Sequence, residues 1–206
     1  LIASERLNVL LTKNPESPLF WLYKARALAI EGANDEALSA FQSALILNPE
    51  SRKIALELSD HLLIMDDHEQ AEQVLTSYAE LKPNDASILT ALARVHEASG
   101  NPEKAEETLL QLTEMSEEND AEIIQQLVAV QVSLEKYTAA VGWAVNLPQQ
   151  DPAIIPVREL RVEALFELGQ EDEAQAEIDR IRRLTPEEGA ETEEDGSDTE
   201  IASIAP

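Results

Sequence analysis

Residues 18–49 read PLFWLYKARALAIEGANDEALSAFQSALILNP, and this stretch decides the fold. Trp21, Ala25 and Leu28 recur at the i, i+4, i+7 spacing of one helical face, and Gly32 then supplies a turn. A second apolar face follows the turn and ends at a proline, which stops a helix from continuing. The stretch therefore predicts two helices joined by a tight turn.

The same unit returns along the chain at a fixed period. Pro15, Pro49 and Pro83 lie 34 residues apart, and after one inserted residue the count resumes at Pro152 and Pro186. Because a single helix pair cannot bury its apolar face, such pairs stack on one another into an all-α solenoid. The five predicted units lie within 18–186 and are 18–49, 52–83, 86–117, 121–152 and 155–186.

The landmarks of this unit resemble those of the tetratricopeptide repeat. Its second helix carries Ala37, Phe41 and Ala44 on one face before Pro49, which matches the family's pattern of alanine, aromatic, alanine and proline. The resemblance implies a right-handed superhelix of stacked antiparallel helix pairs, about five repeats with an N-terminal half repeat. Alanines at one position of the second helices are expected to let neighbouring helices cross closely: Ala37, Ala71, Ala105, Ala140 and Ala174.

Two units lack the turn glycine. Asp66 and Glu135 stand at that position in the second and fourth units. The fourth unit also holds Gly142 within its second helix, where glycine costs about 1 kcal/mol relative to alanine. We therefore expect the fourth repeat to be the least stable, and we expect the prolines between Pro148 and Pro156 to interrupt the regular connection after it.

The two ends of the chain do not form full units. Residues 3–13 keep the phase of a second helix, so 1–15 is expected to belong to a truncated repeat whose first helix lies before residue 1. The unpaired apolar face of that helix leaves room for a homodimer. Residues 187–206 hold eight acids and no bases, a composition typical of a flexible acidic tail.

The charge balance excludes several classes of partner. The chain has 15 basic and 41 acidic residues, a net charge of −26 that repels phosphate backbones and anionic lipids and favours cationic partners. We therefore predict no nucleic-acid partner. No apolar run reaches the roughly 18 residues of a membrane span, so no direct membrane insertion is expected. Cytoplasm and periplasm both fit this composition.

The sequence lacks the motifs of catalysis. It has no phosphate-binding glycine loop, dinucleotide fingerprint, HExxH motif, nucleophile elbow or EF-hand loop, so we predict neither enzymatic activity nor a cofactor. His61 and His68 stand close to three acids and suggest a metal site, but ordinary helix positions explain them better. His96 falls on the face between helices and is predicted to be a packed core histidine.

In tetratricopeptide proteins the inner wall of the superhelix, formed mainly by first helices, binds partner segments. By this resemblance the wall is apolar in the first repeats, with Arg26, Lys53 and Arg94 as isolated basic points. Some family members bind chaperone carboxyl termini through a clamp of lysine and asparagine, but Leu22 and Arg26 occupy its first two positions here. The predicted peptide-groove residues are Leu22, Arg26, Ile30, Lys53, Leu56, Asp60, Leu63, Arg94 and Gln125.

The leading functional hypothesis is a non-enzymatic adaptor or assembly factor that holds a partner protein or peptide in its concave groove. Two alternatives stay open. One is a structural array that assembles with itself end to end through residues 3–13. The other is an acidic chaperone for a basic protein, which rests on the net charge of −26 alone.

Overall fold

The computed structural model describes residues 3–115, 120–145 and 154–185, and this part of the chain consists of helices joined by turns, with no strand. The predicted all-α fold is confirmed, and two helices lie within each of the predicted units. The helices are α1 (Ala3–Lys13), α2 (Pro18–Ile30), α3 (Asn34–Leu47), α4 (Arg52–Ile64), α5 (His68–Leu81), α6 (Ala86–Ala98), α7 (Pro102–Met115), α8 (Ala121–Ser133), α9 (Tyr137–Val145), α10 (Ile155–Glu167) and α11 (Glu171–Leu184).

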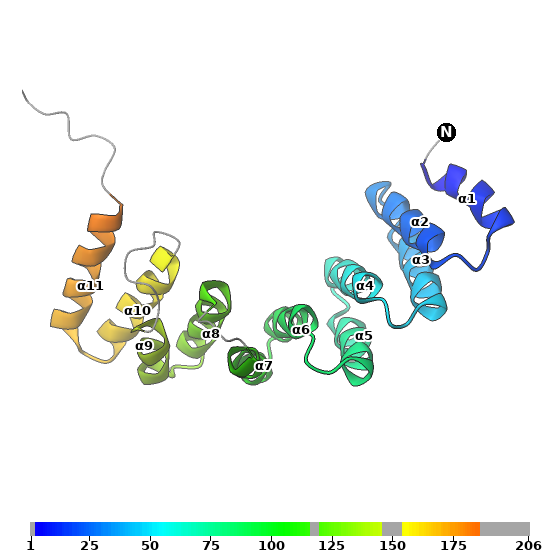
Figure 1. Cartoon of the computed structure of the whole chain (residues 1–206). Coiled ribbons are helices and arrows are strands. Elements are labelled where there is room, and N and C mark those ends of the chain that lie inside the picture. The colour runs from blue at the N-terminus through cyan, green and yellow to red at the C-terminus, as the bar shows by residue number, and fades with distance from the viewer. Residues whose placement is uncertain (1–2, 116–119, 146–153, 186–206) are drawn as a thin grey trace, which may run out of the picture.

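The helices follow one another along a single arc (Figure 1). Each packs on its neighbours in the chain, and first helices of successive repeats also touch, as α4 does with α6 and α8 with α10. In Figure 1, α4 and α6 lie on the inner side of the arc, with α5 and α7 on the outer side. The first helices therefore form the inner wall, as a helical solenoid requires.

Short side chains cap four of the first helices, α2, α4, α6 and α8, whereas α10 has no side-chain cap. The hydroxyl oxygens of Ser17 and Ser51 accept hydrogen bonds from backbone N–H groups in the first turns of α2 and α4. The carboxylates of Asp85 and Asp120 do the same for α6 and α8. These groups satisfy N–H donors that have no partner inside a helix, which explains why the helices begin where they do.

A left-handed residue makes the turn inside each repeat. Gly32 has φ +79°, and the residues that replace glycine at this position, Asp66 and Glu135, adopt the same region with φ +62° and +58°. The left-handed region costs a non-glycine residue roughly 1–2 kcal/mol. The packing of the flanking helices therefore imposes the turn even where the sequence lacks glycine.

The core consists of small and branched residues at the repeat positions. A large cluster runs from α2 to α8, and a second one joins α8, α9 and α10, with Trp143 packed against both. His96 is 7% exposed, which confirms its prediction as a core histidine. The alanines predicted at close helix crossings are all fully buried: Ala37, Ala71, Ala105, Ala140 and Ala174.

Helix α1 packs on α2 through one side only. Ser4 and Leu11 are buried there, and the Ser4 hydroxyl donates a 2.6 Å hydrogen bond to Glu31. The opposite side is open to solvent, with Val9 60% and Leu10 42% exposed. Leu10 stands in the repeat phase whose apolar face the sequence predicts to be unpaired, and Val9 adds to the exposed apolar surface.

Two predictions concern residues outside the described ranges. The irregular connection between Pro148 and Pro156 falls mostly within residues 146–153, and the acidic segment 187–206 lies beyond residue 185. Among the helices that the structure does describe, none combines the length and the apolar character needed to cross a bilayer.

Candidate functional site

A pocket of about 300 Å³ opens on the inner wall between α2 and α4. Its inner part is formed by the buried rings of Phe41 and His61, whose centres are 5.4 Å apart. Ile30 and Ile64 stand at its edge and are 87% and 76% exposed. Because covering such side chains removes apolar surface from water, the pocket suits an apolar side chain of a partner. The other lining residues are Arg26, Ala29, Glu57 and Asp60.

Charged pairs border this pocket. Arg26 Nε donates to Glu57 Oε2 at 2.5 Å, and Arg26 Nη2 donates to Glu57 Oε1. These hydrogen bonds join α2 to α4 and raise the pKa of Arg26. Arg94 Nη2 donates to Asp60 Oδ1 at 2.5 Å and joins α6 to α4. The prediction that Arg26 and Arg94 are isolated basic points is therefore wrong. Each reaches an acid on α4, the neighbouring first helix, because stacking places first helices side by side.

The pocket gathers only part of the predicted groove. Arg26, Ile30 and Asp60 line it, and Arg94 is connected to it through Asp60. Lys53 is exposed near the start of α4 and forms no ion pair within the described residues. Gln125 is half-buried on α8, two repeats further along the wall.

Three predicted groove leucines serve the core to different degrees. Leu22 is 3% exposed and belongs to the large core cluster, which corrects its placement as a groove residue. Its position faces inward between helices instead of toward the open wall. Leu56 and Leu63 are half-buried and pack against the same cluster, so only part of each side chain is open to a partner.

Five residues that line the pocket are absent from the predicted groove: Ala29, Phe41, Glu57, His61 and Ile64. Ala29 and Ile64 directly adjoin the predicted Ile30 and Leu63 in the sequence. Phe41 was assigned to the core, where it is 3% exposed, yet its ring also contributes to the pocket. His61 is equally buried, and its Nε2 lies 3.0 Å from the Asn34 carbonyl oxygen, so packing and this contact account for it without a metal. Glu57 follows Leu56 in the sequence, and the repeat pattern alone does not show that it turns toward Arg26.

Glu97 occupies a special place on the inner wall. It is the counterpart in α6 of Leu63 in α4 and Ala29 in α2, since these residues lie 34 positions apart. Its carboxylate forms no ion pair within the described residues, and desolvation by the surrounding protein raises the pKa of Glu97. The wall therefore carries an uncompensated carboxylate one repeat beyond the apolar pocket.

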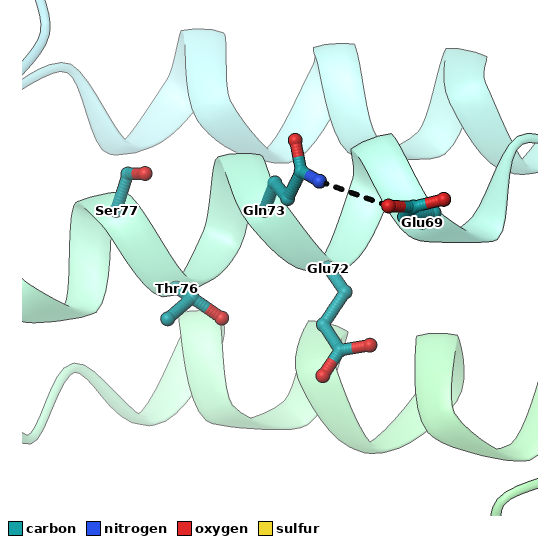
Figure 2. Close-up of a pocket in the computed structure, with 5 residues that line it drawn as sticks. All are labelled: Glu69, Glu72, Gln73, Thr76 and Ser77. Carbon is teal, nitrogen blue, oxygen red and sulfur yellow. Dashed lines mark hydrogen bonds between the residues drawn. The ribbon is translucent and has the colours of Figure 1, made fainter.

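A second hollow, of about 440 Å³, lies over the outer helix α5 (Figure 2). In Figure 2 the Gln73 amide points toward Glu69, to which it donates a 3.3 Å hydrogen bond. Glu72 accepts a 2.7 Å hydrogen bond from Lys104, which lowers the pKa of Glu72. This hollow has no apolar anchor and is the weaker candidate. Its lining residues are Glu69, Glu72, Gln73, Thr76 and Ser77.

Most basic residues of the chain are engaged in ion pairs, many of which join repeats. Lys82 reaches Glu50 at 2.9 Å, and Lys136 pairs with Glu106. The basic residues bound in ion pairs are Arg26, Arg52, Lys82, Arg94, Lys104, Lys136, Arg158, Arg161, Arg180 and Arg182. Few cations are left to offset the acids on the surface, so the exposed charge of the repeats is strongly negative.

A buried charge cluster closes the last repeat. Glu177 is 1% exposed and accepts hydrogen bonds from Arg158, Arg161 and Arg180, the last two at 2.8 and 2.7 Å. Desolvation opposes the charged form of Glu177, but the hydrogen bonds from Arg180 and Arg158 outweigh it and lower the pKa of Glu177. This cluster holds α11 on α10 and engages three arginines, of which Arg158 and Arg161 are largely buried while Arg180 stays half exposed.

The described residues contain no group of three or more side chains suited to hold a metal ion. A helical solenoid with an open inner wall is the architecture of protein-interaction repeats. Sequence models of the tetratricopeptide repeat match residues 28–91 and 62–130, and a further model of the same description matches residues 2–52. The chain belongs to the tetratricopeptide repeat family. Repeats of this family are generally non-catalytic, so the chain is, in general terms, a protein-interaction scaffold.

Solved structures share this fold at low sequence identity, whereas no curated protein sequence matches the chain. A MamA structure has a TM-score of 0.71 at 16% identity, covering 82% of this chain and 92% of that one. YrrB, described as a TPR protein with an unusual peptide-binding site, has a TM-score of 0.69 at 16% identity. The match covers 90% of this chain and 95% of that one. A structure of Naa15/Naa10 bound to HypK-THB has a TM-score of 0.63 at 23% identity. The match covers 88% of this chain but only 28% of that one.

Proposed function

We propose that the chain is a non-enzymatic adaptor that binds a segment of a partner protein along its inner wall. The observation that carries this proposal is the pocket between α2 and α4, with the exposed side chains of Ile30 and Ile64 at its edge. Two large aliphatic side chains that face solvent beside a pocket are typical anchor points of a binding groove.

The chemistry of the wall supports this role. The pairs Arg26–Glu57 and Arg94–Asp60 join successive first helices beside the pocket, which is already open in the unbound chain. A preformed pocket lowers the entropic cost of binding. The description of YrrB, which names a peptide-binding site on the same fold, is in keeping with this proposal.

A selection from displayed random peptides tests the proposal while the natural partner is still unidentified. Peptides selected on the wild-type chain are measured against the variant Ile30→Ser/Ile64→Ser and against Ile46→Ser as a matched control. Ile46 is 80% exposed on α3 but does not line the pocket. Covering an isoleucine contributes about 1.5–3 kcal/mol, so the double variant is expected to bind at least about tenfold more weakly.

The control variant is expected to bind as the wild type does. Circular dichroism of both variants verifies that the helices are intact. Peptides that bind all three proteins equally contradict the proposal, because the pocket between α2 and α4 is then not the working surface.

Self-assembly through α1 is a second candidate function. The exposed side chains of Val9 and Leu10 favour it, since a second copy of the chain can cover them. Light scattering across a concentration series tests this candidate with the variant Leu10→Asp. A concentration-dependent dimer that this variant abolishes supports self-assembly, whereas a monomer at all concentrations excludes it.

A further inference from the structure

We infer that the pocket between α2 and α4 receives an apolar side chain from a cationic segment, whose basic residues lie along the inner wall from α6 toward α10. This inference rests on the proposed function, because it assigns the chemistry of the segment that the inner wall binds.

The basic residues at the pocket are already paired with acids. Arg26 lines the pocket and Arg94 is bonded to its lining residue Asp60, and the two arginines are paired with Glu57 and Asp60. An acidic segment would have to break these pairs and lose their hydrogen bonds. A segment with an apolar anchor can enter the pocket while both pairs stay intact.

Acids without an ion-pair partner among the described residues follow one another along the wall from α6 to α10. Beyond the pocket the wall presents Glu97 on α6, then Glu122 on α8, then Glu159 and Glu163 on α10. None of these four carboxylates forms an ion pair within the described residues. Glu163 stands at the repeat position of Arg26, Asp60 and Arg94, so the fifth repeat places an acid where the first and third place a base.

Glu97 is the wall carboxylate whose charged form is disfavoured by its surroundings. Glu97 is exposed on the wall, the protein around it still desolvates the carboxylate in part and raises its pKa, and it forms no ion pair within the described residues. A cation from a partner would stabilise the charged form. The carboxylates on the wall therefore complement an apolar anchor that is followed by basic residues.

The spacing of such a segment follows from helix packing. Neighbouring helices in contact have axes about 8–10 Å apart, so Glu97 lies roughly 12–15 Å from the middle of the pocket. An extended chain advances about 3.3 Å per residue. The first basic residue is therefore expected roughly four residues from the apolar anchor.

Three fluorescein-labelled peptides of fourteen residues test the inference on the full chain. The first has one leucine in a glycine–serine background, with lysines that begin at the fourth residue after the leucine. The second replaces the lysines with glutamates, and the third replaces the leucine with alanine. Fluorescence anisotropy gives the affinity for wild type, Ile30→Ser/Ile64→Ser, Glu97→Gln/Glu163→Gln and the control Glu114→Gln, whose exposed carboxylate lies on the outer helix α7.

The leucine–lysine peptide is expected to bind most tightly. It should lose about tenfold in affinity on removal of either the two isoleucines or the two glutamates, and less than about twofold on the control change. Equal binding of the alanine–lysine peptide overturns the inference, because attraction to the acidic surface alone then explains binding.

The remaining outcomes separate this inference from the proposed function. If the leucine–glutamate peptide binds as tightly and depends on Ile30 and Ile64, the cationic segment is excluded while the pocket keeps its role. If none of the three peptides binds, but selected peptides that depend on Ile30 and Ile64 do, the inference is also overturned. If no peptide of any kind depends on these isoleucines, the proposed function fails as well.

Discussion

Asp60 Oδ1 lies 2.5 Å from Arg94 Nη2, across the boundary between the second and third repeats. The same aspartate lines the pocket between α2 and α4, so one carboxylate both joins two first helices and borders the candidate binding site. About half of each side chain is exposed, at 52% and 50%.

We predict that the change Arg94→Ala alters the free energy of unfolding by less than about 1 kcal/mol, because solvent screens an ion pair that is half exposed. Urea unfolding at low and high salt measures this difference. A loss well above 1 kcal/mol would show that the pair contributes to repeat stacking and not mainly to the charge of the wall.

The buried alanines allow a sharper prediction. Ala37 and Ala105 are 0% exposed at helix crossings, so replacement of either by leucine overpacks the contact and destabilises the fold by about 1–3 kcal/mol. Thermal unfolding measures the effect. Ala139→Leu, at an exposed position on α9, serves as the control and should leave the midpoint nearly unchanged. An unchanged midpoint for Ala37→Leu would contradict close helix crossing at that position.

The left-handed turns predict two effects of opposite sign. Glu135→Gly should stabilise the chain by about 1 kcal/mol, because glycine adopts φ +58° without the steric cost that glutamate bears. Gly32→Ala should destabilise it by a similar amount, since Gly32 has φ +79°. Chemical denaturation of both variants gives the two values. Equal stability of Glu135→Gly and wild type would mean that the turn relaxes without strain.

The buried cluster on α11 predicts a pH-dependent loss of stability. Glu177→Gln removes the buried carboxylate that pairs with Arg158 and Arg161, which costs about 3–5 kcal/mol near neutral pH. Because the folded pKa of Glu177 is lowered, its contribution is present above the ordinary carboxyl pKa of about 4.3 and is lost as the pH falls below that value.

Urea unfolding of wild type and Glu177→Gln between pH 7 and pH 3 measures this dependence. The difference in free energy should shrink as the pH falls. The control Glu173→Gln, at an exposed position in the first turn of α11, should show a small and constant difference. A gap that stays constant for Glu177→Gln down to pH 3 would exclude the charged carboxylate as its source.

The architecture could be predicted from the spacing of residues such as Pro15, Pro49 and Pro83, because helix ends and repeat length are local properties of the chain. The turn at Glu135 could also be predicted from the repeat length, although the residue is not glycine. Its φ of +58° confirms that turn.

The site was less accessible to prediction. Whether Arg26 is free or paired depends on how far α4 is rotated against α2, which no repeat pattern specifies. Leu22 was misplaced for the same reason, since a small rotation of α2 decides between wall and core. The pocket itself arises from three helices, α2, α3 and α4, and forms only through their mutual packing.

Methyl NMR of the isoleucines, recorded while a selected peptide is added, tests the central claim most directly. The account predicts that the methyl signals of Ile30 and Ile64, at the pocket between α2 and α4, shift with peptide concentration while that of Ile46 does not. Shifts at Ile46 with Ile30 and Ile64 unchanged would place binding on another surface and contradict the account.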